Sequence, residues 1–322
     1  MKKYLGPVLK VAFAAAILTW MARTSKLNFS QIAGALSHWP LLLVVVALVY
    51  GQVLINVWRW ELLLRAQDLF IGLRQAFRLT LIGMLFNVVI PGAVGGDVIK
   101  AYYVARDAAG RKAQAAGTIL FDRIIGLLAL LLLTAGAAVW NLSLIQSNRA
   151  LTGLSLFALL GAAGGVAGLY LVVTFGSRFA LRKPSGRIAA SYSQLMVGLD
   201  GYRRSPGILP AAILVSVAGH SLACTAIYLS FRAIDSPAVA LRHFLVLVPI
   251  GLMTTAIPIS PAGIGVGQVA FLSLFQMVAP QRATAAVNAF TVFQTLNVLV
   301  CLSGLYAYLS YRREAKPQSL QK

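Results

Sequence analysis

The stretch NVVIPGAVGGDVIKAYYVAR, residues 87–106, interrupts an apolar segment that covers residues 76–105. It carries Pro-Gly at 91–92 and Gly-Gly at 95–96, directly before Asp97. Proline lacks a backbone donor and clashes with the preceding helical turn, whereas glycine tolerates a positive φ. We therefore expect two short helices joined by a tight non-helical link, which in a membrane protein forms a re-entrant hairpin.

A second apolar segment, residues 244–279, is interrupted in the same way. Its middle reads IPISPAGIG, residues 257–265, with two prolines and two glycines. Non-helical backbone is very costly in hydrocarbon, so both links must be buried in protein or face a wet cavity. The two links therefore predict a polar site within the membrane. The sequence leaves open the alternative that these residues only let helices pack closely.

Composition assigns the chain to the multi-pass membrane proteins. Hydrophobic residues make up 59% of the chain and charged residues 11%, which excludes an ordinary soluble domain. Besides the two interrupted segments, six apolar runs are long enough to span a bilayer. They are residues 5–21, 40–57, 113–140, 151–175, 207–231 and 283–311. The first run is similar to a signal peptide, but comparable runs recur to the end, so we expect a spanning helix.

The distribution of Lys and Arg predicts which side of the membrane each loop faces. With a cytoplasmic N-terminus and two hairpins that return to the face they enter from, twenty bases fall on the cytoplasmic side and six on the other. Arg59 and Lys100 are counted in the cytoplasmic set. If the first interrupted segment crossed instead, the six bases of residues 178–204 would face outward. We therefore expect hairpins, with both termini cytoplasmic and the chain in the cell membrane.

This arrangement has an internal symmetry. Each half reads helix, helix, hairpin, helix, and the two hairpins enter from opposite sides. Inverted repeats with broken helices near the midplane are the recurrent architecture of secondary transporters. The predicted fold is therefore an all-α polytopic membrane protein with six spanning helices and two re-entrant helical hairpins. It forms a single membrane domain, residues 1–322, with repeat halves of about 1–148 and 149–322.

Two ionisable residues lie inside a predicted span. Asp122 and Arg123 come about ten residues into the run that begins near residue 113, which is about 15 Å into a core of about 30 Å. Charges at that depth are rare unless they are paired or functional. They can neutralise each other, or form a salt bridge with the first hairpin, where Asp97 and Lys100 share a helical face at i, i+3. A binding role for an anionic group is compatible with either pairing, since Arg suits phosphate geometry.

Other polar residues carry weaker signals. His220 is either a proton carrier or, more commonly for a lone helix histidine, a packing residue. Asn288, Thr291 and Thr295 share one face of the last helix and either line a path or join helices. The two cysteines lie in apolar stretches and predict packing rather than a disulfide or metal site, and we expect no cofactor. The formal charge of +20 fits a cytoplasmic collar near anionic lipid, so nucleic-acid binding is not expected.

These motifs together resemble the membrane domain of the lysylphosphatidylglycerol synthase/flippase family, also called the flippase-like domain family. The resemblance rests on residues 87–106, on AGTILFDRIIGLL at 116–128 and on PISPAGIGVGQVAFL at 258–272, and it covers essentially the whole chain. The family often carries Arg at the position of Lys100 and an acid at that of Gln268. Lys100 keeps the charge, whereas Gln268 cannot titrate. We expect no soluble aminoacyl-transfer domain of the kind that bifunctional members carry, and therefore no synthesis of lysyl-lipid.

The resemblance implies the movement of a lipid between leaflets. Together with the polar links it defines a set of candidate substrate-binding residues. They are Asn87, Pro91, Gly92, Gly95, Gly96, Asp97, Lys100, Asp122, Arg123, Pro258, Pro261, Gly263, Gly265 and Gln268. We expect the cations to attract an anionic head, the acids to position them, and the Gly-Pro links to supply backbone groups and room.

The leading hypothesis is therefore a flippase or scramblase for an amphiphile such as an anionic phospholipid, an aminoacylated lipid, a hopanoid or a polyprenyl-type lipid. Its expected partners are membrane lipids, and homo-oligomerisation stays open. The alternative is a non-transporting membrane subunit that binds a lipid-synthesis or lipid-modifying enzyme. An intramembrane enzyme that uses Asp97 and Asp122 is weaker, because the sequence has no metal-ligand cluster or nucleophile-base pair.

Overall fold

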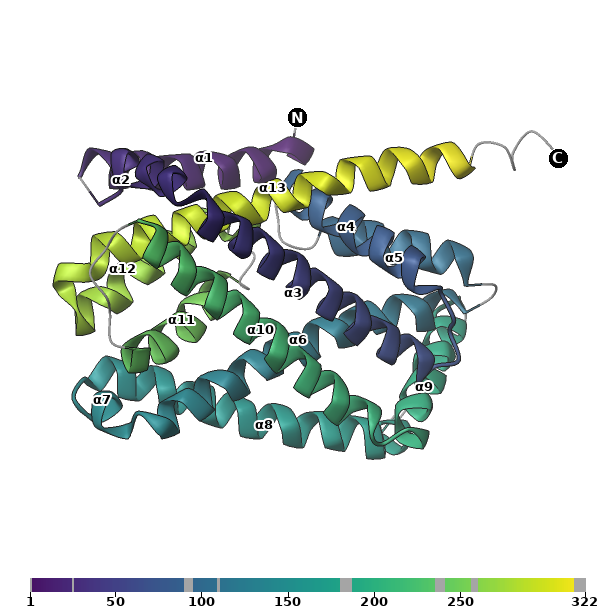
Figure 1. Ribbon diagram of the computed structural model, residues 1–322. Coiled ribbons are helices and arrows are strands. Elements are labelled where there is room, and N and C mark those ends of the chain that lie inside the picture. Colours follow the sequence, from purple (N-terminus) through teal and green to yellow (C-terminus); the bar gives the residue numbers. More distant parts are fainter. Residues whose placement is uncertain are drawn as a thin grey trace.

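The protein is a bundle of helices (Figure 1). The computed structural model describes residues 2–24, 26–89, 95–108, 111–179, 187–234, 241–255 and 260–315, and every regular element in these ranges is helical. The α-helices are α1 (Lys2–Arg23), α2 (Phe29–Gly34), α3 (Trp39–Arg65), α4 (Leu73–Val89), α5 (Gly95–Asp107), α6 (Lys112–Trp140), α7 (Leu142–Gln146), α8 (Arg149–Phe179), α9 (Arg187–Arg204), α10 (Ile208–Ala233), α11 (Leu241–Thr255), α12 (Val266–Val278) and α13 (Ala283–Ala315). Three short 3₁₀ turns are η1 (Ala35–His38), η2 (Pro261–Gly263) and η3 (Pro280–Arg282).

Five helical segments in the described part of the chain are long and apolar enough to cross a bilayer. They are Phe29–Arg65, Lys112–Trp140, Arg149–Phe175, Ile208–Ala233 and Pro280–Tyr311. The chain is therefore an all-helical, multi-pass membrane protein, as expected. The remaining expected span, residues 5–21, falls in α1, whose described apolar part, Ala12–Arg23, is shorter than a span. A sixth span stays a prediction.

Each interrupted segment consists of two helices that contact each other. α4 packs against α5, and α11 packs against α12. Residues 90–94 lie between the first two helices, and residues 256–265, which include η2, lie between the second two. Figure 1 shows α4 and α5 toward the end of the bundle where α9 lies, and α11 and α12 toward the opposite end, near α7. Three candidate residues, Pro91, Gly92 and Pro258, lie outside the described residues.

The contact between α4 and α5 depends on the absence of a side chain at Gly96. A Cβ atom at this position would overlap the carbonyl oxygen of Gly83 on α4 and lie 2.8 Å from Oδ1 of Asn87. The backbone of α5 therefore lies directly against that of α4. Close approach of this kind is the use that small residues have in membrane helix packing.

We expect Gly96→Ala to lower the free energy of unfolding by about 1–3 kcal/mol, because the added methyl group must push α5 away from α4. Thermal unfolding in detergent measures the change. The matched control is Gly164→Ala on α8, where a Cβ would have no atom within 4 Å and where alanine favours the helix. A melting temperature for Gly96→Ala at or above that of Gly164→Ala would contradict this account.

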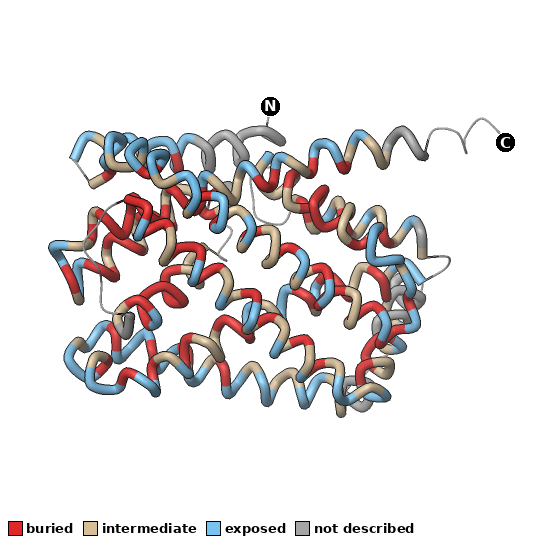
Figure 2. Tube along the Cα trace, viewed as in Figure 1, coloured by how far each residue is buried: buried red, intermediate tan, exposed pale blue. Residues whose placement is uncertain are grey.

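The centre of the bundle is built on α3 and α10, which pack along each other and against α6. Buried residues concentrate on the helices at the centre, whereas α8 packs on α6 and alternates buried with exposed residues along its length (Figure 2). The outward face of α8 carries large apolar residues such as Phe157 and Leu160, which are 64% and 63% exposed. Exposed apolar side chains on a long helix suit contact with lipid. The bundle therefore has α3 and α10 in its core and α8 at a surface suited to lipid.

The structure corrects one sequence expectation at the end of α3. The predicted span ended at residue 57 and left Arg59 in a cytoplasmic loop, but α3 continues to Arg65 and buries Arg59 at 7% exposure. Lys100, also counted among the cytoplasmic bases, is 6% exposed within α5. Arg59 was wrongly placed outside the span, because α3 is longer than expected. Lys100 lies on a helix of the first interrupted segment, as expected, and neither residue is an exposed loop charge.

Candidate functional site

A cavity of about 460 Å³ lies within the bundle, between the first interrupted segment and the helices that surround it. Its walls come from α3, α4, α5, α6, α10, α11 and α13. The polar residues of its lining are Gln52, Asn56, Arg59, Thr80, Asn87, Asp97, Lys100, Asp122, Arg123, His220, Thr255 and Asn297. The structure thus brings together five of the predicted site residues, Asn87, Asp97, Lys100, Asp122 and Arg123.

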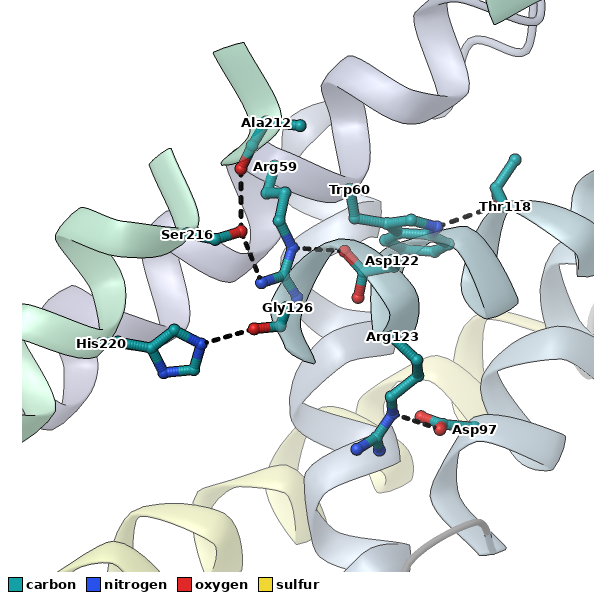
Figure 3. Close-up of polar contacts among 10 residues, drawn as sticks. All are labelled: Arg59, Trp60, Asp97, Thr118, Asp122, Arg123, Gly126, Ala212, Ser216 and His220. Carbon is teal, nitrogen blue, oxygen red and sulfur yellow. Dashed lines mark hydrogen bonds and ion pairs between the residues drawn. The ribbon is translucent and has the colours of Figure 1, made fainter. Parts of the chain in front are cut away.

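Arg59 and Asp122 form a buried ion pair on the cavity wall (Figure 3). Nε of Arg59 donates to Oδ1 of Asp122 at 2.7 Å, and the two side chains are 9% and 11% exposed. Nη1 of Arg59 also donates to the hydroxyl of Ser216 on α10 at 3.0 Å. A Cβ atom at Gly126 would come within 3.2 Å of the same guanidinium, so glycine leaves the space that the Arg59 side chain uses. This pair joins α3, α6 and α10.

Arg123, the next residue on α6, forms a second and more exposed ion pair. Its Nε donates to Oδ2 of Asp97 at 2.6 Å, and the side chains are 50% and 19% exposed. Figure 3 shows Arg123 pointing toward α5, away from the Arg59 pair. Consecutive residues on α6 therefore serve two separate pairs, and the pairing of Arg123 links α6 to the first helical turn of α5.

Lys100 is the third cation of the cavity. Its ammonium lies 3.6 Å from the centre of the Trp60 ring, and the ring is fixed by a hydrogen bond from the indole nitrogen to Oγ1 of Thr118 at 3.1 Å. Within the described residues, Lys100 has this cation–π contact and no carboxylate in ion-pair distance. Three cations and two carboxylates among the described lining leave the cavity with an excess of positive charge.

The N-terminus of α5 lies at the edge of this cavity, since Asp97 in its first turn is part of the lining. The amide of Gly96 donates to Oδ1 of Asn87 at 2.9 Å, so the last turn of α4 supplies an acceptor for the first turn of α5. Gly95 begins the helix, and Asp97 places a carboxylate in its first turn, where the helix dipole favours negative charge. Asn87 therefore orients α5 at the edge of the cavity.

The predicted residues of the second link lie elsewhere. Gln268 is 1% exposed and accepts a hydrogen bond from the amide of Gly265 at 2.7 Å through its side-chain oxygen. Its amide nitrogen donates to Gln294 on α13 at 2.7 Å, and Gln294 donates in turn to the carbonyl oxygen of Ala262 at 2.9 Å. Gly263 and Gly265 adopt φ of 73° and 86°, and Pro261 opens η2. None of the four predicted residues, Pro261, Gly263, Gly265 and Gln268, is in the described lining of the cavity.

His220 and Arg59 are cavity residues whose roles the sequence did not assign. Nε2 of His220 lies 2.9 Å from the carbonyl oxygen of Gly126, which accepts its hydrogen, so the histidine joins α10 to α6 at the cavity (Figure 3). Of the two alternatives for His220, this contact fits a packing residue that also borders a polar space. One sequence signal could have placed Arg59 inside a helix. The apolar residues Val53, Val57 and Trp60 repeat at i, i+4 and i+7 and continue the helical pattern past residue 57, the expected end of the span.

The protein is thus a multi-pass helical membrane protein with a charged, partly buried cavity among its apolar helices. Residues 8–303 match the family described as the lysylphosphatidylglycerol synthase TM region. The match covers nearly the whole chain, so the protein belongs to this family, as the sequence motifs indicated. No curated protein and no solved structure matches the chain.

Proposed function

We propose that the protein is a flippase-like or scramblase-like lipid transporter that moves an anionic amphiphile between leaflets. The observation that carries this proposal is Lys100, a buried cation on the wall of a membrane cavity with no carboxylate in ion-pair distance among the described residues. Burying a charge without a partner costs free energy. A buried cation that has no carboxylate partner is therefore a site where a ligand can supply the counter-ion. The phosphate of a lipid head is such a counter-ion.

The hydroxyl of Thr80 supports the same proposal. Its oxygen is buried on the cavity wall and has no hydrogen-bond partner in the described part of the chain. A buried polar atom without a partner costs about 1–3 kcal/mol. A small movement of the cavity wall toward a bound head would give this hydroxyl an acceptor, and the volume of about 460 Å³ has room for a headgroup.

The proposed topology keeps six spans, two re-entrant hairpins and an inverted repeat, with both termini in the cytoplasm. It is supported by the placement of α4 and α5 toward one end of the bundle and of α11 and α12 toward the other. The cavity takes its lining from the end of α11 as well as from α4 and α5. A head between these elements would sit near mid-depth, because Gly126 on the cavity wall is the central residue of α6.

In the proposed mechanism, the head enters beside the exposed pair of Arg123 and Asp97. A phosphate competes with the carboxylate of Asp97 for the guanidinium, which is suited to both groups. Lys100 then becomes the second cation on the phosphate, while the buried pair of Arg59 and Asp122 keeps α3, α6 and α10 in place. No bond is made or broken in this process, so we propose a non-enzymatic role.

The test is lipid translocation in liposomes that contain the purified protein. The probe is phosphatidylglycerol with a fluorophore on one chain, quenched from outside by a membrane-impermeant reductant. We expect the protein to accelerate its translocation above protein-free liposomes, and Arg123→Gln to reduce the rate to the protein-free value. Arg204→Gln, at an exposed position on α9, is the matched control and should transport normally.

Two outcomes would overturn parts of this proposal. Unchanged transport in a folded Arg123→Gln protein would remove the role of that residue. Failure of the wild-type protein to transport anionic or neutral lipids would favour the non-transporting subunit, and a chemically altered lipid at the end of the assay would indicate an enzyme.

A further inference from the structure

A second hollow of about 520 Å³ is lined by α6, α10 and α11. Its lining includes Leu132 and Gly136 on α6, Cys224 and Tyr228 on α10, and Pro249 on α11. The hollow is open to the surroundings, since Trp140 and Leu245 at its border are 89% and 43% exposed. We call this hollow the apolar groove.

Three polar side chains in the lining of the apolar groove are bonded to the backbone of their own helices. The hydroxyl of Ser221 donates to the carbonyl oxygen of Val217 at 2.9 Å, and that of Thr225 donates to Ser221 at 2.9 Å. The side-chain nitrogen of Asn141 donates to Ala137 at 2.9 Å. With these groups engaged, the groove presents mainly carbon atoms, and a polar ligand would gain little there.

The apolar groove and the charged cavity are lined by three of the same helices, α6, α10 and α11. On α10 the two linings lie side by side, since Ala223 borders the cavity and Cys224 borders the groove. On α11 they follow one another, with Leu252 at the cavity and Pro249 at the groove. On α6 the cavity lining reaches Leu130, and the groove lining begins at Leu132 and runs to Trp140 at the end of the helix. The eight residues after Leu132, up to Trp140, rise about 12 Å, a little less than half of a hydrocarbon core of about 30 Å.

We infer that the apolar groove holds one hydrocarbon chain of the lipid whose anionic head occupies the charged cavity. This inference rests on the proposed function. The order of the two sites, a charged cavity at the centre of α6 and an apolar groove toward its end, matches the order of head and chain in a single amphiphile. In the proposed orientation the chain points from the cytoplasmic side outward, as in a lipid of the cytoplasmic leaflet.

The groove differs from an ordinary lipid-facing surface in a way that supports one seated chain. Gly136 provides the open space at its floor, since a Cβ atom at this position would have no neighbour within 4 Å. Hydrocarbon gains little from leaving the bilayer, so retention must come from van der Waals packing in a concave surface and from the head bound next to it. Occupancy of the groove should therefore depend on the head.

The experiment uses phosphatidylglycerol with a photoactivatable diazirine on one chain, in liposomes that contain the full-length protein. After illumination, mass spectrometry should find label on residues 132–141 of α6 and 217–228 of α10. Gly136→Leu fills the groove without a backbone clash and should lower this labelling by at least about threefold relative to Gly164→Leu on α8. Lys100→Met should lower it as well, because the head no longer holds the chain in place.

The results separate this inference from the proposed function. Two results would overturn the inference. One is labelling of the groove that equals labelling of the α8 surface, and the other is labelling that is the same with diazirine phosphatidylcholine and is unaffected by Lys100→Met. If wild-type transport persists in that case, the proposed function stands without it. If wild-type transport is absent while labelling depends on Lys100, the chain site stands in a protein that binds the lipid without moving it.

Discussion

Lys100→Met should lower the rate of phosphatidylglycerol translocation about tenfold to a hundredfold while the protein stays folded. A hydrogen bond to a charged group contributes about 1.5–3 kcal/mol, and each 1.4 kcal/mol corresponds to about a factor of ten. Methionine keeps an unbranched apolar stem against the Trp60 ring and removes only the charge, so packing on α3 is preserved. Initial rates at several lipid concentrations measure the loss, with thermal unfolding as the measure of folding.

Two further variants make this prediction specific. Lys112→Met removes a lysine that is exposed at the start of α6 and should transport at the wild-type rate. Lys100→Arg keeps the charge and should retain most of the activity, since a guanidinium also binds phosphate and lies well on an aromatic ring. If Lys100→Met transports like Lys112→Met, the ammonium of Lys100 has only a structural role, and the proposed site loses its main phosphate-binding residue.

The sequence predicted the interruptions because their causes are local. Proline and glycine act on the backbone within one helical turn, and α4 ends at Val89 and α5 begins at Gly95, on either side of the predicted link. The same locality explains why Asp97 and Lys100, at i, i+3, both reach the cavity. Whether the two hairpins are re-entrant depends on their relation to the bilayer and stays part of the proposal.

Partners of the charged residues could not be read from the sequence, because they come from helices far apart in the chain. Arg123 pairs with Asp97, which was one of the two alternatives, whereas Asp122 pairs with Arg59, a residue that had been assigned to a loop. An arginine two residues past an apolar run looks like the edge of a membrane span. Only the packing of α3 against α6 and α10 shows that Arg59 is interior.

Gln268 illustrates the opposite case, in which a residue noted for its motif has a local role. Its side chain accepts from the Gly265 amide and donates to Gln294, which holds the start of α12 against α13. A glutamine can donate and accept at once, which a carboxylate cannot. The substitution of an acid by Gln268, as the resemblance indicated, therefore gives a network that needs no charge at this position.

Asp122→Ala should be the most destabilising single substitution in the cavity. It leaves the guanidinium of Arg59 buried without its carboxylate, and breaking a buried ion pair from one side costs about 3–5 kcal/mol. We expect a fall of this size in the free energy of unfolding, measured in mixed micelles. The matched control is Glu61→Ala, which breaks the more exposed i, i+4 pair with Arg65 on α3 and should cost about 0.5 kcal/mol or less.

The double variant Arg59→Met with Asp122→Leu tests whether the unpaired buried charge of Arg59 is what destabilises Asp122→Ala. Removing both charges also removes the cost of burying them, so replacement of a buried pair by apolar residues is often neutral or stabilising. We therefore expect the double variant to be more stable than Asp122→Ala by at least about 3 kcal/mol. If the double variant is as unstable as the single one, the hydrogen bond from Arg59 to Ser216 and the local shape, rather than the charge pair, hold α3 to α6 and α10.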